Sequence, residues 1–286
     1  MPPKVPAGFQ DQLAVFKLRA LRIITWPWRA FRKICYYVGL IVVIIGFILS
    51  LIGFHFFSTL PKIEALKFED FKAMAQKRTS ERRQGKGPKP VWIPISKVSK
   101  PYLYSIVTSE DAQFFDHDGI ELDSIVASSL NNLRKRKVES GASTLSQQVV
   151  KNIFLTPERT ISRKLRELVL TTRMEERLSK NEILELYLNL IEVGPDMYGI
   201  GVAAEYYFRK KPSEINAAEG AFIALMLPSP RKFHYMLFEN RNLPRDKARK
   251  LRRVLSDLLV QDFITHQQYR EYIRYPFFKY APKAIK

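Results

Sequence analysis

The longest apolar run of the chain covers residues 35–57, which read CYYVGLIVVIIGFILSLIGFHFF and contain no Asp, Glu, Lys or Arg. A helix of about 20 apolar residues crosses a bilayer core of about 30 Å. A buried helix of a globular domain would carry a polar face, and the apolar part of a cleaved signal peptide is only about 7–15 residues long and lies nearer the N-terminus. The run therefore predicts a transmembrane helix over 35–57.

Between residues 101 and 275, apolar residues recur at intervals of three and four, and the alternation typical of strands is scarce. The segment 164–178 predicts a helix whose buried face holds Leu165, Leu168, Val169 and Leu178. A second apolar stripe, on an otherwise basic segment, consists of Leu251, Val254, Leu255 and Leu258. These patterns predict an all-α domain over 101–275, followed by a C-terminal tail over 276–286.

Capping residues mark three helix starts within this domain. Residues 179–182 (Ser-Lys-Asn-Glu) and 144–147 (Thr-Leu-Ser-Gln) fit the capping box, in which the first and fourth residues exchange hydrogen bonds with the backbone. Residues 156–158 (Thr-Pro-Glu) place a cap residue before a proline and an acid, which both favour a first helical turn. We expect helices to begin at these three places.

Lysine and arginine around the apolar run predict its orientation. Residues 15–34 hold six Lys or Arg and no acid, whereas residues 58–77 hold four Lys mixed with three acids. Because positive flanks stay in the cytoplasm, residues 1–34 are expected to form a basic cytoplasmic segment. Residues 58–100 then form a juxtamembrane helix and linker. The helical domain is expected on the extracytoplasmic (periplasmic) side of the cytoplasmic, or inner, membrane, in a single-pass protein.

Composition narrows the choice of partner. The 286 residues carry 47 Lys plus Arg against 28 Asp plus Glu, a formal net charge of +19, which indicates an anionic partner. No nucleic acid is expected, because most of the chain lies outside the cytoplasm and the sequence has neither RNP-type aromatic strands nor zinc-finger spacing. The one cysteine, Cys35, excludes a disulfide scaffold and a cysteine zinc cluster. The anionic partners that remain possible are a membrane surface and a phosphorylated substrate.

Three polar groups have the residue types of a catalytic site. In EDAQFFDHDG (110–119), Phe114 one helical turn after Glu110 would raise the pKa of that carboxyl toward the range of a general base. In GASTLSQQVVKN (141–152), hydroxyls and free amides at a helix start suit an anion. In RTISRKLRE (159–167), cations gather around Glu167 as a diphosphate requires. Taken singly, each group also fits a surface acid, a capped helix or a solvated helix face.

Together with KNEILELYLN (180–189), these groups occur in an order that resembles the motif series of the peptidoglycan glycosyltransferases, glycosyltransferase family 51. That family includes monofunctional biosynthetic peptidoglycan transglycosylases and the first domain of class A penicillin-binding proteins. The resemblance covers residues 91–259 and includes YGIGVAAEYYF and EGAFIALMLPSPRKF. It implies a lysozyme-like glycosyltransferase domain behind a single N-terminal transmembrane helix. The implied reaction is the polymerisation of lipid II into β-1,4-linked glycan strands, with inversion and release of undecaprenyl diphosphate.

The resemblance also implies roles for individual residues. Glu110 matches the general base that deprotonates the acceptor 4-hydroxyl, and Glu167 matches a second essential acid that organises the donor site. The cations that match positions near the donor diphosphate are Lys151, Arg159, Arg163 and Lys164. The polar donor-site motif corresponds to Ser143, Thr144, Gln147 and Gln148. The residues that match positions shaping the first motif are Asp111, Phe114 and His117.

Departures from the family pattern are few. Ala142 replaces the second glycine of the usual Gly-Gly-Ser-Thr run, and residues 249–259 match the C-terminal Arg-rich motif only loosely, so no catalytic role is assigned there. Residues 120–138, with four consecutive cations at 134–137, correspond to a membrane-dipping region of the family. A monofunctional enzyme is expected, since the sequence ends at Lys286 without a transpeptidase domain.

The resemblance extends to cofactors and partners. No cofactor is required, and no metal site is assigned, although a divalent cation (Mg²⁺ or Mn²⁺) near the diphosphate is compatible with the family. The expected partners are lipid II, the growing lipid-linked glycan and the membrane, together with a transpeptidase or another protein of cell-wall synthesis. These expectations describe an enzyme of cell-wall biogenesis and cell shape.

Two other functions fit the same residues. A lytic, lysozyme-like enzyme would release soluble fragments from finished peptidoglycan without a lipid-linked donor. A catalytically silent, membrane-tethered scaffold would keep the fold but would need neither Glu110 nor Glu167, both of which are present. Oligomeric state and product length leave no signal in the sequence.

Overall fold

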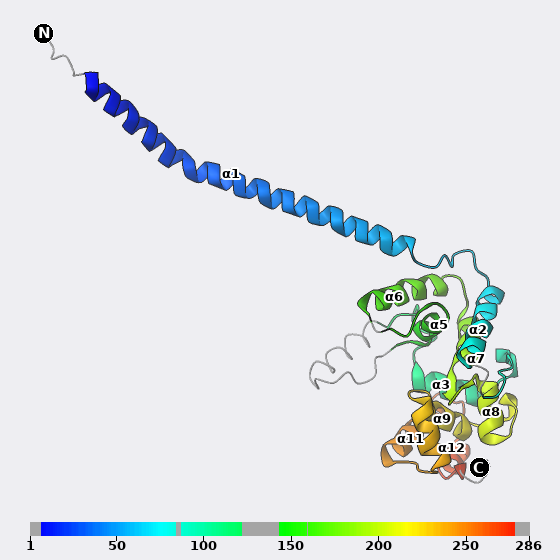
Figure 1. Ribbon diagram of the computed structural model, residues 1–286. Coiled ribbons are helices and arrows are strands. Elements are labelled where there is room, and N and C mark those ends of the chain that lie inside the picture. The colour runs from blue at the N-terminus through cyan, green and yellow to red at the C-terminus, as the bar shows by residue number, and fades with distance from the viewer. Residues whose placement is uncertain (1–6, 84–86, 122–142, 159, 278–286) are drawn as a thin grey trace. The chain divides into compact units, whose positions relative to one another are not determined.

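The computed structural model describes residues 7–83, 87–121, 143–158 and 160–277 (Figure 1). Its contacts divide the chain into two units, Met1–Leu60 and Pro61–Lys286. The described part of the first unit is one helix, α1 (Ala7–Ser58). Within α1, Ala30–Ser58 is long and apolar enough to cross a membrane. The expected span over 35–57 lies inside this stretch, which confirms the predicted N-terminal membrane helix.

The second unit is mostly helical, which confirms the predicted all-α class. Its helices are α2 (Phe68–Arg83), α3 (Lys100–Glu110), α5 (Leu145–Phe154), α6 (Ile161–Glu175), α7 (Lys180–Leu190), α8 (Ile200–Phe208), α9 (Ala217–Met226), α10 (Pro230–Phe233), α11 (Arg245–Val260) and α12 (His266–Tyr272). Three short helical segments lie between them: η1 (Ile95–Lys97), η2 (Pro212–Glu214) and the π-helical η3 (His234–Glu239). Within the described ranges, the strands β1 (Glu192–Gly194) and β2 (Met197–Tyr198) form a small antiparallel hairpin, with Glu192 opposite Tyr198 and Gly194 opposite Met197.

The core is built around α9, whose residues are all buried. Helices α3 and α11 pack against α9, and the predicted stripe of α11 (residues 251–258) is buried in this contact region. Gly220 lets α3 approach closely, because a Cβ there would lie 3.0 Å from the Ser105 hydroxyl oxygen and 3.0 Å from the Tyr102 Cα. This packing sets the direction of α3 and therefore the position of Glu110 at its C-terminal end.

Helix α2 belongs to the second unit. It packs against α7 and α5 through a buried face. Arg78 Nε donates a hydrogen bond to the Ile153 carbonyl at 2.8 Å, and Arg82 donates to the Asn152 side chain and carbonyl at 2.8 and 3.0 Å. These bonds satisfy carbonyls at the C-terminal end of α5, where a helix lacks internal donors. Contacts therefore group residues 61–100, expected as a juxtamembrane helix and linker, with the helical domain.

Two of the three expected helix starts are confirmed. Thr144 and Ser179 are the N-caps of α5 and α7, each within a capping box. The start expected at 156–158 is wrong, because these residues are not helical. Helix α6 begins instead after Thr160, whose side chain accepts a hydrogen bond from the Arg163 amide at 3.1 Å. Thr156 and Thr160 each precede residues that could form the first turn of a helix, and Thr160 is the one that caps α6.

The expected buried face of segment 164–178 is wrong for α6. Leu165 is 49% exposed, and of the expected residues only Leu178, beyond the end of the helix, is buried. The buried residues of α6 are Glu167, Leu170, Thr171 and Met174. The polar members of this face have partners inside the domain: Glu167 pairs with cations, and the Thr171 hydroxyl donates to the Glu167 carbonyl at 2.7 Å. The helix thus turns a partly polar face inward.

Candidate active site

Glu110 is the last residue of α3 and lies partly buried. Burial raises the pKa of its carboxyl, as the sequence predicted. The Lys250 ammonium and a hydrogen bond from the Gln148 side chain act in the opposite direction. The predicted geometry is wrong, however: α3 ends at Glu110, so Phe114 does not lie one helical turn further along the same helix. Glu110 is therefore a carboxylate at a helix end, with an elevated pKa and cations nearby.

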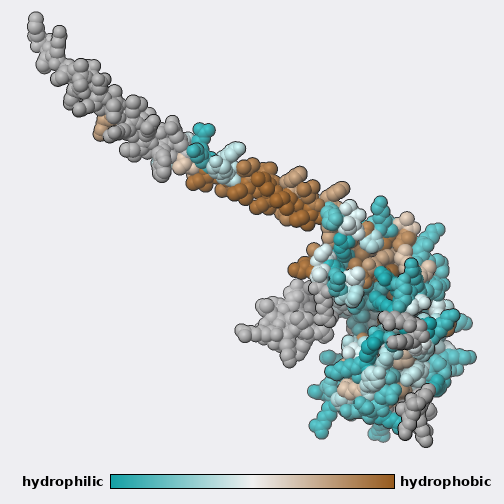
Figure 2. All heavy atoms as spheres, viewed as in Figure 1, coloured by the Kyte–Doolittle hydropathy of each residue, from teal (hydrophilic) through white to brown (hydrophobic). Residues whose placement is uncertain are grey.

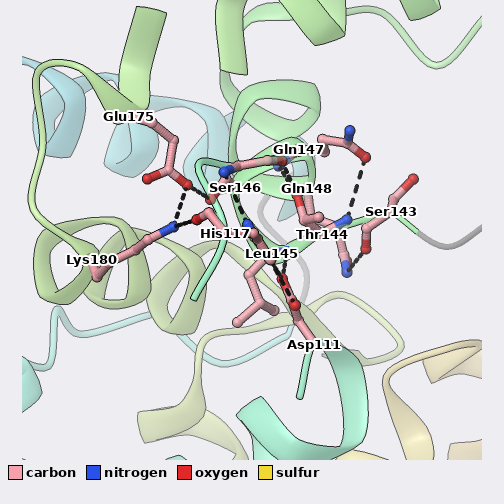
Figure 3. Close-up of polar contacts among 11 residues, drawn as sticks. Asp111, His117, Ser143, Thr144, Leu145, Ser146, Gln147, Gln148, Glu175 and Lys180 are labelled. Atoms are coloured by element: carbon pink, nitrogen blue, oxygen red, sulfur yellow. Dashed lines mark hydrogen bonds and ion pairs between the residues drawn. The ribbon is translucent and has the colours of Figure 1, made fainter. Parts of the chain in front are cut away.

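The helix ends here because the Asp111 side chain is used elsewhere (Figure 3). Its carboxylate accepts a hydrogen bond from the Leu145 amide at 2.9 Å and lies 3.0 Å from His117 Nε2. His117 Nδ1 accepts from the Gly119 amide at 2.9 Å, and the Thr144 hydroxyl donates to the Gly119 carbonyl at 2.6 Å. These bonds tie the loop of residues 111–119 to the first turn of α5.

A second set of contacts supports this loop from the other side. The Lys180 ammonium donates to the His117 carbonyl and, at 2.9 Å, to Glu175, which also accepts from the Ser146 hydroxyl at 2.5 Å (Figure 3). Phe114 is fully buried, and its ring centroid lies 4.8 Å from the Lys180 ammonium. The loop that follows Glu110 is consequently held by partners from α5, α6 and α7.

Glu167 lies on the inner face of α6 and is 2% exposed. Its carboxylate accepts a hydrogen bond from Arg163 Nη1 at 2.6 Å and pairs with the Lys164 ammonium. The Lys164 Nζ also lies 3.4 Å from the Ser143 hydroxyl oxygen and 3.4 Å from Gln147 Oε1. Polar residues of the two segments 141–152 and 159–167, which the sequence analysis treated separately, thus form one cluster. In it, two cations surround a buried carboxylate.

Gln147 adds an unsatisfied donor to this cluster. Its side chain is fully buried, and its Oε1 accepts from the Thr144 amide at 3.3 Å. Its Nε2 has no hydrogen-bond partner among the described residues. A buried donor left unpaired costs about 1–3 kcal/mol, so a ligand that accepts this hydrogen bond gains affinity. The amide lies beside Lys164, where a ligand oxygen would also meet a positive charge.

Lys151 connects the two carboxylates electrostatically. Its charge lowers the pKa of Glu110, and Glu167 in turn raises the pKa of Lys151. The largest influence on Lys151 is desolvation of its ammonium, which lowers the pKa of that group, and Arg163 acts in the same direction. The general-base candidate and the cationic cluster therefore belong to one electrostatic site.

Two residues of this site escaped the sequence analysis. Lys250 of α11 interacts with Glu110, and burial lowers the pKa of the Lys250 ammonium while Glu110 raises it. Tyr187 of α7 is fully buried, its hydroxyl has no partner among the described residues, and burial followed by the charge of Glu110 raises the pKa of its phenol. The basic character of segment 249–259 was the available signal for Lys250. Tyr187 lies in segment 180–189, where the spacing of apolar residues is that of an ordinary buried helix face, and so it gave no separate signal.

Two predicted parts of the site lie outside the described residues. Arg159, expected near a diphosphate, is one of them. The other is most of segment 120–138, including the four cations at 134–137. The other predicted site residues lie in the described ranges. They come together from α3, α5, α6 and the loop of residues 111–119.

The donor set of the cluster does not suit a metal held by protein side chains. The described ranges contain no group of three or more His, Cys, Asp or Glu side chains placed to hold an ion. Both oxygens of Glu167 are engaged, one by Arg163 and one by Lys164. The side chains in the described ranges therefore offer no complete set of protein ligands for a metal ion, and the compatibility of a divalent cation with the substrate stays a prediction.

Comparison with known proteins identifies relatives that are similar to this chain in sequence. The chain is 42% identical over 161 residues to the biosynthetic peptidoglycan transglycosylase of Chromobacterium violaceum, a match that spans 56% of this chain and 68% of that protein. It is 34% identical over 220 residues to the enzyme of the same name from Nitrosospira multiformis, covering 77% and 90% of the two chains. A match to penicillin-binding protein 1A of Aquifex aeolicus is 35% identical over 185 residues and spans 65% of this chain but only 25% of that protein.

The family model described as transglycosylase matches residues 76–258. That range contains Glu110, the loop of residues 111–119, the cationic cluster around Glu167 and Lys250, and it extends over well over half of the 286 residues. It also begins within α2, in agreement with the packing of that helix against α5 and α7. This chain belongs to the transglycosylase family.

Proposed function

We propose that this protein is a membrane-anchored peptidoglycan glycosyltransferase that polymerises lipid II into β-1,4-linked glycan strands. The observation that carries the proposal is the pairing of a carboxylate of raised pKa, Glu110, with a cationic cluster built around Glu167. The names of the relatives from Chromobacterium violaceum and Nitrosospira multiformis support the same activity.

In the proposed reaction Glu110 accepts the proton of the acceptor's GlcNAc 4-hydroxyl. A raised pKa makes the ionised carboxylate a stronger base. The hydroxyl oxygen forms a bond to the anomeric carbon of the donor, and the bond from that carbon to the lipid diphosphate breaks. The diphosphate leaves with the electron pair, and because attack comes from the opposite face, the configuration inverts.

The cationic cluster suits the leaving group. A diphosphate departs as a stable anion, so the site needs positive charge and hydrogen-bond donors more than it needs a general acid. Arg163, Lys164 and Lys151 supply charge, and Gln147 Nε2 supplies an unpaired donor. A glycoside hydrolase would use a second carboxyl group as an acid. Glu167 is unsuited to that role because two cations hold its carboxylate. This arrangement favours transfer over lytic cleavage.

The proposed location follows from α1 and its flanks. The protein lies in the cytoplasmic membrane with its N-terminus in the cytoplasm, as six Lys or Arg in residues 15–34 favour. The domain of residues 61–277 then works on the extracytoplasmic side, where it meets lipid II and the growing lipid-linked glycan. A transpeptidase is the expected partner, since the glycan strands that this domain makes require crosslinking.

Purified full-length protein incubated with lipid II tests the proposal. We expect polymeric glycan and released undecaprenyl diphosphate, and we expect Glu110→Gln and Glu167→Gln each to reduce the rate by at least about a hundredfold. Glu176→Gln, at an exposed position just after α6, is the matched control and should keep full activity. Full activity of Glu110→Gln would overturn the assignment of the base, and inactivity of the unmodified protein would overturn the function.

A further inference from the structure

A cavity of about 240 Å³ lies between α2, residues 89–92 and the C-terminal end of α7. Gln76, Ser80 and Arg83 line it from α2, where they follow one another at the spacing of helical turns. None of the described residues that line the cavity belongs to the site of Glu110 or to the cationic cluster around Glu167. The cavity is therefore separate from the candidate active site.

The wall opposite α2 is held in place by hydrogen bonds to α7. Trp92 Nε1 donates to the Glu185 carboxylate at 2.8 Å, which fixes the indole ring. The Asn189 side chain donates to the Ile93 carbonyl at 2.9 Å and accepts from the Ile93 amide at 2.8 Å. Because these groups already have partners, the wall keeps its shape without a ligand, and binding does not have to order it.

Arg83 offers an unused donor to this cavity. Its Nη1 donates to the Gly87 carbonyl at 2.9 Å, whereas its buried Nε has no partner among the described residues. The acceptor is itself fixed: Gly87 has a φ of 71°, and a Cβ there would lie 2.4 Å from the Asp196 carbonyl oxygen. A buried donor without an acceptor is unfavourable, so a ligand oxygen that accepts from Nε would gain affinity.

The charge of the lining selects an anion. Lys89 adds a second cation to that of Arg83, and no acidic side chain is among the described residues that line the cavity. Charge-assisted hydrogen bonds from guanidinium and ammonium groups are the strong ones for carboxylate and phosphate oxygens. Ser80, at an exposed position of α2, adds a hydroxyl beside the two cations. The polar part of the lining therefore suits a carboxylate or a phosphate.

The remaining lining and the size of the cavity indicate what carries that anion. The visible surface of the second unit is mostly hydrophilic (Figure 2), whereas Pro90, Val91 and Trp92 give the cavity an apolar side, with Val91 69% exposed. Inorganic phosphate alone would leave this side in water. Cavities for drug-sized ligands measure about 300–1,000 Å³, so this one suits a single ring. A sugar ring offers C–H groups to an aromatic wall and hydroxyls to polar side chains.

We propose that this cavity binds an anionic sugar, with the ring against Trp92 and its carboxylate or phosphate at Arg83 and Lys89. A sugar acid and a sugar phosphate share this chemistry, and the two are separated by experiment. The site would give the protein a second position for carbohydrate, apart from the one where the proposed reaction takes place. Binding at this cavity does not depend on the proposed glycosyltransferase activity.

Isothermal titration calorimetry on full-length protein in detergent micelles tests the selection of ligand. The probes are N-acetylmuramic acid, N-acetylglucosamine 1-phosphate, neutral N-acetylglucosamine and inorganic phosphate. We expect at least one anionic sugar to bind saturably and at least about tenfold more tightly than the neutral sugar and inorganic phosphate. Binding of only one of the two anionic sugars would support the site and identify its anion as carboxylate or phosphate.

Variants locate the binding. Arg83→Met and Lys89→Met should each weaken it by about tenfold or more, and Ser80→Phe should do the same by filling the cavity without changing its charge. Lys97→Met, at an exposed position of η1, is the matched control. Lys164→Met removes a cation of the cationic cluster and should leave the affinity within about twofold of the unmodified protein.

Two outcomes would overturn the proposal. One is the absence of saturable binding by either anionic sugar, or binding no tighter than that of the neutral sugar. The other is binding that is lost in Lys164→Met but retained in Lys89→Met and Ser80→Phe, which would place the sugar at the cationic cluster. Because Lys89 and Ser80 are exposed, these two variants decide the matter even where Arg83→Met does not fold. Inactivity on lipid II with intact sugar binding would overturn the proposed function alone.

Discussion

The Lys164 ammonium lies 3.4 Å from the Ser143 hydroxyl oxygen, although the two residues are 21 positions apart and lie in different segments. The same ammonium pairs with Glu167 and lies 3.4 Å from Gln147 Oε1. One cation thus connects α6 with the residues around the start of α5. The Lys164 ammonium therefore forms the centre of the cationic cluster.

Lys164→Met is expected to weaken both binding of the donor and its reaction. The substitution keeps most of the side-chain volume but removes the charge that would stabilise a departing diphosphate. We expect kcat/KM on lipid II to fall by about 10²–10³-fold. Lys77→Met, at an exposed position of α2, is the control and should match the unmodified enzyme. Activity within about twofold of that enzyme would contradict a role for Lys164 at the diphosphate.

Lys250→Met is expected to change the pH dependence of the reaction. The Lys250 charge lowers the pKa of Glu110, so its removal raises the pKa of that carboxyl further. Since the base works only when ionised, the acid limb of the kcat/KM profile should move to higher pH. Arg253→Met on the exposed side of α11 provides the comparison. An acid limb that stays in place would mean that Lys250 does not act on Glu110.

Glu110→Gln is expected to stabilise the fold at neutral pH. Burial raises the pKa of Glu110 above its ordinary value of 4.5, so the folded protein favours the protonated carboxyl. Stability from this protonation is fully present below pH 4.5 and is lost as the pH rises through the folded-state pKa. Glutamine imitates the neutral form at every pH. Denaturant unfolding should therefore show the variant to be more stable at neutral pH, with the difference vanishing in acid; a difference independent of pH would refute this explanation.

Asp111→Ala is expected to destabilise the loop that follows Glu110. The Asp111 side chain is the acceptor for the buried Leu145 amide and a partner of His117, and loss of such bonds costs about 1–3 kcal/mol. Asp116→Ala, at an exposed position of the same loop, should change the free energy of unfolding by no more than about 0.5 kcal/mol. Chemical denaturation measures both values. Similar results for the two variants would show that Asp111 does not hold the loop.

Local signals predicted much of this fold from the sequence. The capping boxes of α5 and α7 depend on residues three positions apart, so their hydrogen bonds can be predicted from the local sequence alone. The membrane helix and the α11 stripe follow from periodicity and length in the same way. The choice between Thr156 and Thr160 as the cap of α6 depends on where the helix docks, and local sequence did not resolve it.

The errors arose where distant residues compete with local preference. α3 ends at Glu110 because Asp111 binds the Leu145 amide, 34 positions away, and no helical pattern near Phe114 reveals that contact. Lys250 meets Glu110 only because α11 and α3 pack on the same core helix. The face of α6 was predicted by assuming that apolar residues point inward. That assumption fails for α6, whose buried face carries Glu167 and Thr171.

The arginine contacts of α2 matter to anyone who prepares this enzyme without its anchor for inhibitor screening. A soluble fragment that starts at residue 101 would lack Arg78 and Arg82, leaving the last turn of α5 without two of its donors. It would also lack Phe71, which is fully buried and packs edge-on against Phe154. Such a fragment is expected to expose hydrophobic surface and aggregate, whereas one that starts at Pro61 retains every one of these contacts.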